Sequence, residues 1–498
     1  MANGHDQQDG AAAPAKHPAF LTVFPSIMLP MFLAVVDQTI VATALPAIAA
    51  ATGDVGRASW IVVAYLIAAT IAAPMYGRLG DSFGRKPIMF GALALFIVAS
   101  ILCAVSPSIL TLTLARILQG LGGGGLMTLS QALVGETIPP RERARYQGYL
   151  AAVAVCANTF GPVAGGYLTE HFGWQSIFLV NIPIGFGAMW LATRLPPPRA
   201  DRLKWTSDSG GLIYFTIFVS TALLALEQVQ HANSAQLPTG GALLVVGLIA
   251  LVLLVRHESR AASPLIPLKL LRLPEIWHSD AMAACHGAAL VSLITFMPVF
   301  LEVVREASPS ETGLLLVPLT IGIGAGSLLT GRLVSRTGRT TIYPVVGLIL
   351  ATVTLLVMAI WASELGNLTI SGLLLLNGLF MGPVMGVVQV IVQNAAGSMR
   401  LGEAAASVQF SRSIGAAFGT ALVGTVLFAF LALRNPEAAR VFSEMVEHLG
   451  GGGPAISAAQ RGAIHADIVA AFRAAFLLIG VFTAGGCVLA YTNPQRRI

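Results

Sequence analysis

The feature that most constrains this chain is a series of apolar runs, each long enough to cross a lipid bilayer as a helix. The hydrocarbon core of a bilayer requires about 20 consecutive apolar residues per helix. The 498 residues contain fourteen such runs, and no soluble domain separates them. We therefore predict an all-α polytopic membrane protein. The runs lie at 20–50, 58–79, 87–106, 108–130, 145–168, 174–194, 208–228, 238–256, 277–301, 312–334, 341–361, 368–395, 403–432 and 469–491.

The composition excludes several classes of protein. Apolar residues make up 55% of the chain and charged residues only 10%, whereas about a quarter of the residues of a typical soluble domain are charged. The net charge of +6 is spread sparsely between apolar runs, so we predict no nucleic-acid partner. The sequence shows no nucleophile–base pair and no metal-ligand spacing, even among its four cysteines. We therefore predict neither an enzyme, nor a metal site, nor a cofactor.

Lysine and arginine determine the expected orientation. With the N-terminus in the cytoplasm, 21 of the 29 basic residues fall on the inner side and six on the outer side. This asymmetry follows the positive-inside rule and requires an even number of spans, so both termini are expected in the cytoplasm. The polar residues 1–19 lack the basic start of a signal peptide, which favours a disordered cytoplasmic tail before a retained first helix.

An internal repeat divides the chain into two halves. Residues 77–86 and residues 331–339 match at five positions, and they are separated by eight spans. Internal repeats are common in secondary transporters. Two six-helix halves would place the second copy six spans later, so we predict that two helices are inserted between the halves. The expected segments are the tail 1–19, an N-terminal six-helix bundle 20–194, two inserted helices with an interfacial linker 195–276, a C-terminal six-helix bundle 277–491 with a long outer loop 433–468, and a second cytoplasmic tail 492–498.

Asp37 is the one acid that the pattern places deep inside a span. A charged Asp at the centre of a bilayer costs about 2.5–3.5 kcal/mol on insertion scales, so such residues usually face the protein interior and have a function. Desolvation favours the protonated carboxyl, whereas a bound cation favours the ionised one. One site could therefore bind either a proton or a cationic substrate. The alternative is a structural acid that is hydrogen-bonded near a helix end.

Several motifs together identify a family. The pattern G-x-L-x-D-x-x-G-R-K at residues 77–86 resembles the signature of the major facilitator superfamily. Residues 112–122 are similar to its R-x-x-Q-G motif, and residues 161–166 are similar to its G-P-x-x-G-G antiporter motif. Residues 36–46 resemble a signature of the fourteen-helix drug:proton antiporters, as does the segment around Trp174, although Gln175 stands where a basic residue is usual. The resemblance extends from about residue 20 to residue 491.

The resemblance implies a role for each motif. Proton coupling and substrate handling are implied for Asp37, Arg116 and Gln119, with a purely structural tie as the alternative for Arg116. A gating loop is implied for Gly77, Asp81, Gly84, Arg85 and Lys86, whose basic residues equally serve as a topological anchor; the second copy has Ser335 in place of Asp81. A tight, bent helix contact of the kind found in exporters is implied for Gly161, Pro162, Gly165 and Gly166.

Polar residues inside the spans are candidates for a central cavity, because polar groups that face lipid are costly. These candidates are Gln38, Asn158, Asn181, His286, Asn377, Gln389 and Gln393. Among the residues inside the spans, only Asp37 and His286 are expected to change charge. A mostly apolar cavity of this kind suits lipophilic cations better than sugars or peptides.

The sequence therefore predicts a secondary active transporter that exports lipophilic cationic drugs in exchange for protons by alternating access. The proton gradient supplies the energy, and the partners are the lipid bilayer, protons and a small lipophilic substrate. We expect a monomer in a bacterial inner membrane, with a fungal plasma membrane as the alternative, and the outer loop 433–468 leaves docking of a periplasmic adaptor open. Two other functions remain: export of one endogenous metabolite, siderophore or lipid on the same fold, and a non-transporting membrane sensor.

Overall fold

The computed structural model describes residues 23–53, 57–197, 208–230, 237–261, 264–265, 268–447 and 458–497. The predicted tail 1–19 and the glycine run of the outer loop lie outside the described residues. The described chain is helical, with no strand of more than an isolated bridge. Its helices are α2 (Phe24–Thr52), α3 (Trp60–Phe83), α4 (Arg85–Ala104), α5 (Ile109–Thr137), α6 (Pro140–Phe172), α7 (Ser176–Leu179), α8 (Asn181–Ala192), α9 (Ser209–Gln230), α10 (Leu237–Glu258), α11 (Leu268–Leu271), α12 (Pro274–Val303), α13 (Pro309–Thr337), α14 (Ile342–Trp361), α15 (Asn367–Ala396), α16 (Leu401–Arg434), α17 (Pro436–Glu447) and α18 (Ala458–Thr492).

Twelve helices in the described ranges are long and apolar enough to cross a membrane. Two shorter apolar helices, Ser176–Ala192 and Ser209–Ala225, lie where the sequence predicts the sixth and seventh spans. The first of these is divided between α7 and α8, and Asn181 at the start of α8 turns its side chain toward the interior of the bundle. The structure thus shows a polytopic helical membrane protein with about twelve long apolar helices, and the predicted count of fourteen spans is not confirmed by it.

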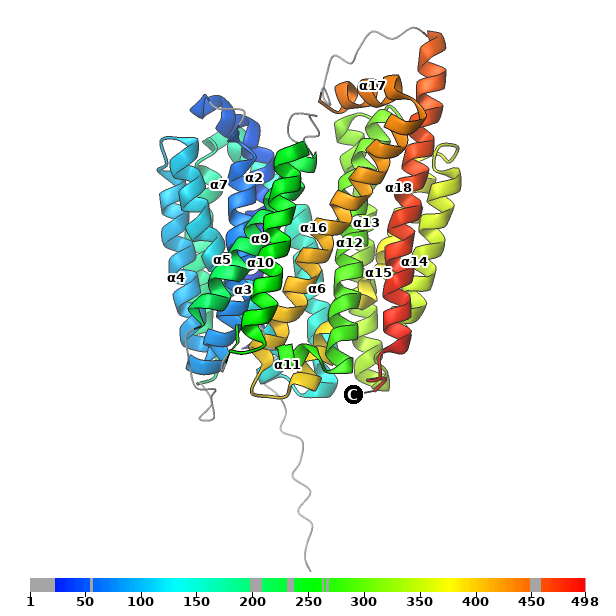
Figure 1. The fold of residues 1–498 in the computed structure, drawn as a ribbon. Coiled ribbons are helices and arrows are strands. Elements are labelled where there is room, and N and C mark those ends of the chain that lie inside the picture. The colour runs from blue at the N-terminus through cyan, green and yellow to red at the C-terminus, as the bar shows by residue number, and fades with distance from the viewer. Residues whose placement is uncertain are drawn as a thin grey trace, which may run out of the picture.

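The helices gather into two bundles. Helices α2 to α8 share one apolar core, and α12 to α18 form the other side of the molecule around two further cores. The bundles stand side by side, with α4 and α5 at one side of the molecule and α14 and α18 at the other (Figure 1). The end at which the chain terminates is the one that charge predicts to be cytoplasmic, and we call it the inner end.

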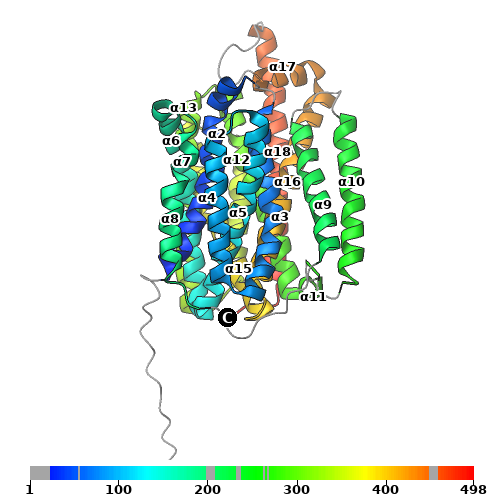
Figure 2. The ribbon, with the colours of Figure 1, turned by 90° about the vertical axis from the view of Figure 1, so that its left-hand side faces the viewer.

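Helices α9 and α10 form a pair outside the two bundles (Figure 2). Helix α9 packs against α3 and α16, while α10 packs against α9. The pair is joined at one end by Asp208, whose carboxylate accepts hydrogen bonds from the Gly211 N–H at 2.9 Å and from His257 Nε2 at 2.7 Å. Burial raises the pKa of Asp208, but these hydrogen bonds outweigh burial and hold its pKa below the usual value.

Two short helices lie across the ends of the bundles (Figure 1). Helix α11 lies at the inner end, within the segment predicted to be interfacial. Helix α17 lies at the outer end, inside the loop 433–468, and its buried Phe442 packs against Phe428 and Phe472 of the neighbouring helices. Part of the predicted outer loop is therefore an ordered amphipathic helix seated on the C-terminal bundle.

The repeated motif is mostly helical, which corrects its prediction as a loop. Helix α3 runs through Gly77 and Asp81 to Phe83, and α4 begins at Arg85. Only Gly84 interrupts the helices; its φ of +94° is a conformation that favours glycine. The chain therefore turns within one residue, and Asp81 and Arg85 lie on adjoining helix ends.

Candidate functional site

A buried polar network joins four helices of the N-terminal bundle. The carboxylate of Asp37, within α2, accepts hydrogen bonds from Arg116 Nη1 at 2.6 Å and from Gln119 Nε2 at 2.8 Å, both on α5. Asn181, the first residue of α8, donates to the same carboxylate at 2.7 Å. Gln119 also donates to Ser100 of α4 at 2.8 Å. All five side chains are fully buried, so the structure brings together four predicted residues and one that the sequence analysis missed.

Hydrogen-bond acceptors and an aromatic ring surround the buried charge of Arg116. Arg116 and Gln119 are three residues apart, which places them on one face of α5, and Nη1 also donates to Gln119 Oε1 at 2.6 Å. Arg116 Nε donates to the Ile61 carbonyl at 3.3 Å, and the guanidinium lies 4.2 Å from the centre of the Tyr65 ring. Burying a single charge costs several kcal/mol unless it is paired and hydrogen-bonded. Protonation of Asp37 would therefore remove the main partner of a buried cation.

Tyr65 separates this network from a small cavity. Its ring lies against Arg116, and its hydroxyl donates to the Ala34 carbonyl at 3.3 Å. The same residue lines a cavity of about 70 Å³ together with Gln38, Gly123, Gln409 and other residues. Within the described part of the chain, Asp37 lines neither this cavity nor the central cavity described below. The carboxylate is thus one side chain away from a space between the bundles.

A second polar site holds the two bundles together at the inner end. Both carboxylate oxygens of Asp81 accept hydrogen bonds from the Gly402 N–H at 3.0 Å, and one also accepts from the Glu403 N–H at 3.0 Å. Arg85 forms ion pairs with Asp81 and with Glu136 of α5. A carboxylate is stabilised at a helix N-terminus, where free N–H groups and the helix dipole meet it. We call Asp81, Arg85, Glu136 and the start of α16 the inner latch.

Close helix packing supports the inner latch. A Cβ atom on Gly77 of α3 would collide with the Gly402 backbone of α16, so these helices touch through their backbones. Lys86 lies on the other side of the turn and donates to the Thr193 and Leu195 carbonyls, each at 2.7 Å. The sequence analysis grouped the gating residues but gave no partner on α16, and their gating role stays a prediction.

The antiporter motif lies at the contact between α6 and α2. Cβ atoms on Gly161 and Gly165 would collide with Thr39, Thr43 and the backbone around Ile40, whereas Gly166 faces open space. Helix α6 continues through Pro162. Small residues permit this close approach of two helices, and α2 is the helix that carries Asp37.

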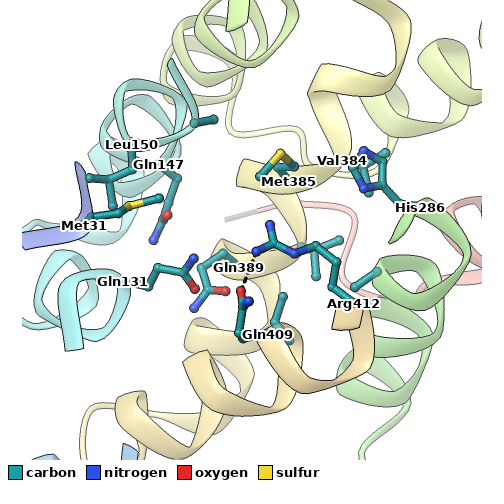
Figure 3. Close-up of a pocket in the computed structure, with 14 residues that line it drawn as sticks. Met31, Gln131, Gln147, Leu150, His286, Val384, Met385, Gln389, Gln409 and Arg412 are labelled. Carbon is teal, nitrogen blue, oxygen red and sulfur yellow. Dashed lines mark hydrogen bonds between the residues drawn. The ribbon is translucent and has the colours of Figure 1, made fainter. Parts of the chain in front are cut away.

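A central cavity lies between the two bundles (Figure 3). Its volume is about 30 Å³, which accommodates water but not a drug-sized molecule. Helices α2, α5 and α6 contribute one wall, and α12, α15 and α16 contribute the other. The polar lining residues are Gln131, Gln147, His286, Gln389, Gln409 and Arg412, and apolar residues such as Met31, Leu150, Val384 and Met385 fill the spaces between them.

The predicted cavity residues have different places. His286 and Gln389 line the central cavity, and Gln38 lines the smaller one. Asn377 instead binds within the C-terminal bundle, to Thr354 Oγ1 at 2.8 Å. Gln393 donates to the Gln131 carbonyl at 2.9 Å and so ties the bundles together. Asn158 of α6 is exposed and lines none of these cavities, so its place in a cavity stays a prediction.

Several polar residues of the cavities were missed by the sequence analysis. Gln131 lies just beyond the predicted end of a span, because α5 continues to Thr137. Gln147 lies only two residues into its predicted span, and Arg412 shows no neighbouring motif. Near the inner end, Asp280 and Glu403 line a cavity of about 200 Å³ with Trp277, Phe410 and other residues. A wider search for isolated charges within spans would have found Arg412 and Asp280.

Comparison with known proteins gives consistent results. The family model of the Major Facilitator Superfamily matches residues 27–420. An MFS-type transporter of Mycobacterium tuberculosis is 34% identical over 415 residues, which are 82% of this chain and 60% of that protein. The drug efflux pump JefA of the same species is 31% identical over 427 residues, 82% of this chain and 80% of that one. The chain thus spans less than two thirds of the first of these relatives.

The fold also matches solved structures. The human organic anion transporter MFSD10 superposes with a TM-score of 0.67 over 95% of this chain and 100% of that chain. Its sequence identity is 14%, so this similarity concerns the fold alone.

Proposed function

The chain belongs to the Major Facilitator Superfamily, and from that premise we propose that it is a secondary active transporter that exports lipophilic compounds in exchange for protons. It is a multi-pass membrane protein, and its relatives include proteins named as multidrug transporters and drug efflux pumps. The two bundles would alternate access to the central cavity, and the inward movement of protons would supply the energy.

The observation that carries this proposal is the buried pair of Asp37 and Arg116. Both side chains are fully shielded from solvent, and they connect α2 to α5. Protonation of Asp37 would leave the Arg116 charge without its carboxylate, which favours a different packing of these helices. Because α2 and α5 also supply Met31 and Gln131 to the central cavity, a change at the pair is transmitted to the space between the bundles.

We infer that Asp37 carries the proton rather than the cargo. The prediction of a cationic cargo requires this carboxylate to face the cargo. In the described conformation the carboxylate faces Arg116, Gln119 and Asn181, and Tyr65 lies between the network and the nearest cavity. Proton and cargo would then be coupled through helix packing instead of competing for one carboxylate.

Alternating access requires the inner latch to open. The latch closes the inner end in this conformation, and the central cavity is too small for a drug. Loading from the cytoplasm would therefore require α3 and α16 to separate. Because Asp81, Arg85 and Gly402 form a discrete contact, they provide the kind of two-state element on which such a transition depends.

We also propose fourteen crossings, with both termini in the cytoplasm and the protein in a bacterial inner membrane. Two observations support the number. The shorter apolar helices α7–α8 and α9 lie where two of the fourteen apolar runs are found, and α9 packs along α3 and α16. An even number of crossings is also required by the distribution of lysine and arginine.

The proposal is tested with purified protein in liposomes that carry an imposed pH gradient and a trapped pH indicator. The wild type should accumulate lipophilic dyes and move protons in the opposite direction. Asp37→Asn should lose at least tenfold in gradient-driven uptake and show no coupled proton movement, because an amide keeps the shape but carries no proton. Exchange of dye for dye across the membrane, which needs no net proton, should persist.

The matched control is Asp467→Asn, which removes a carboxylate paired with Arg434 at the outer end. This variant should retain coupled transport. Proton movement at the wild-type ratio in Asp37→Asn would refute Asp37 as the proton site, and absence of dye transport by the wild type would refute export.

A further inference from the structure

The central cavity contains a positive charge that no carboxylate of the described residues neutralises. Arg412 of α16 extends toward Gln389 and Gln409 (Figure 3). Its Nη2 donates a hydrogen bond to Gln409 Oε1 at 2.5 Å. Among the described residues, no ion pair joins Arg412 to a carboxylate. Arg116, at the centre of the other bundle, shows the opposite situation, because Asp37 pairs with it.

An arginine remains charged at every physiological pH, because its guanidinium does not lose a proton in proteins. A charge at membrane depth is costly, and such residues usually mark a substrate or ion pathway. Arg412 therefore stands where an oppositely charged group is favoured. A lipophilic cation entering the same cavity would meet a like charge in a low-dielectric surrounding.

Other groups around the cavity provide further hydrogen-bond donors. Gln147 Nε2 and Gln389 Nε2 are buried and have no hydrogen-bond partner among the described residues. They come from α6 and α15, so they approach the cavity from its two walls. Four of the five guanidinium N–H donors of Arg412 are not accounted for by the bond to Gln409. A planar carboxylate is the group that such a fork of donors binds best.

Apart from Gln131 and His286, the rest of the lining is apolar. Met31, Leu150, Val384, Met385 and Val388 surround the polar groups and offer a surface for a hydrocarbon or aromatic body. Ligand sites commonly combine a mostly apolar wall with a few converging polar groups. When the bundles separate, this lining would fit a compound with an apolar body and one acidic group.

We propose that the cargo of the central cavity is a lipophilic monocarboxylate, bound by Arg412 through its guanidinium and supported by the amides of Gln147 and Gln389. This rests on the proposed function, since it names the substrate class of the exporter. It replaces the cationic cargo that the sequence analysis predicts. Asp37 retains the proton in its own network, so proton and cargo occupy separate sites.

Binding to the purified protein in lipid nanodiscs tests the proposal with three probes of similar size. Triphenylacetate carries a carboxylate, triphenylacetamide is its neutral counterpart, and tetraphenylphosphonium is a lipophilic cation. The wild type should bind triphenylacetate at least tenfold more tightly than either of the other two. Arg412→Gln should remove that preference, and Arg412→Lys should retain part of it, because it keeps the charge but loses the planar fork.

The control variant is Arg473→Gln, which removes an exposed arginine of α18 and should bind like the wild type. Equal binding of triphenylacetate and its amide by the wild type would overturn the proposal, and this comparison needs no folded variant. Tighter binding of tetraphenylphosphonium that is lost in Asp280→Asn would also overturn it, in favour of the acidic cavity near the inner end. If the wild type exports no dye but still prefers the carboxylate, the proposed export function is wrong and the carboxylate site is supported. If it exports dye but shows no preference for the carboxylate, the export function is supported and the carboxylate site is wrong.

Discussion

The two copies of the repeated motif make the same helix contact with different chemistry. Gly77 of α3 touches the backbone of α16 at Gly402, and Gly331 of α13 touches the backbone of α6 at Ala144; a Cβ on either glycine would collide with a carbonyl. In the first copy Asp81 follows one turn later and binds the N-terminus of α16. In the second copy that position is Ser335. The close backbone contact at the glycine is therefore present in both copies, whereas the hydrogen bonds from a helix N-terminus to an acid are present only in the first.

The starts of the two partner helices explain the difference. Helix α16 begins at Leu401, and the N–H groups of Gly402 and Glu403 are directed at Asp81. In α6, which begins at Pro140, the Glu142 N–H stands at the position of the Glu403 N–H and already donates to the Pro139 carbonyl at 2.9 Å. An acid at this position therefore stabilises the contact only where the start of the partner helix offers free N–H groups. A repeat in sequence can preserve packing while its charges diverge.

The largest effect is expected from Asp81→Asn. The change replaces a buried carboxylate that accepts hydrogen bonds from Gly402, Glu403 and Arg85. Hydrogen bonds to charged groups contribute about 1.5–3 kcal/mol each, so we expect the state with a closed inner end to lose about 3 kcal/mol, or roughly 100-fold in population. Distances between spin labels at the inner ends of α3 and α16 would measure the shift. A distance distribution identical to that of the wild type would show that Asp81 does not hold the inner end closed.

An intermediate effect is expected from Arg85→Lys. The two ends of the Arg85 guanidinium pair with Asp81 and Glu136 separately, and one ammonium group cannot reproduce this fork. Loss of one partner should cost about 1.5 kcal/mol, or roughly tenfold in the closed population, at the low end of the range for a hydrogen bond to a charged group. The matched change in the second copy is Arg339→Lys, which alters an exposed arginine and should leave spin-label distances unchanged. Equal shifts in both variants would mean that the copies do not differ in their ionic contacts.

Much of the fold can be predicted from the sequence, because the bilayer imposes a length on every apolar run. The twelve full-length helices fall on predicted runs, and α9 and α10 come between the two bundles in the sequence, where the repeat offset requires an insertion. The exceptions have a local cause. The predicted end of a span is inaccurate where small and polar residues continue the helix. Helix α5, for example, extends to Thr137, so that Gln131 is part of the helix and lines the cavity.

The candidate site is less predictable, because it depends on which helix faces meet. Asp37, Arg116, Gln119 and Asn181 can each be named from motifs, but their convergence needs the packing of α2, α5 and α8. Arg412 illustrates the opposite problem. It belongs to no motif. Its proposed role in binding an anion depends on the absence of an acidic partner among the described residues, and that absence can be seen only in the three-dimensional structure.

The smallest effect is expected from Ser335→Asp, which gives the second copy the acid that it lacks. If an acid one turn after the glycine were sufficient, this variant would strengthen the contact between α13 and α6 and favour closure of the inner end. We expect a change of less than about 0.5 kcal/mol, the usual range for a surface substitution, because the Glu142 N–H already donates to the Pro139 carbonyl and the Glu142 carboxylate adds a like charge at that helix start. The spin-label distance between the inner ends of α13 and α6, with the thermal unfolding midpoint as a check on folding, would measure this. A clear shift in Ser335→Asp by itself would show that the acid, rather than the donors on the partner helix, distinguishes the two copies.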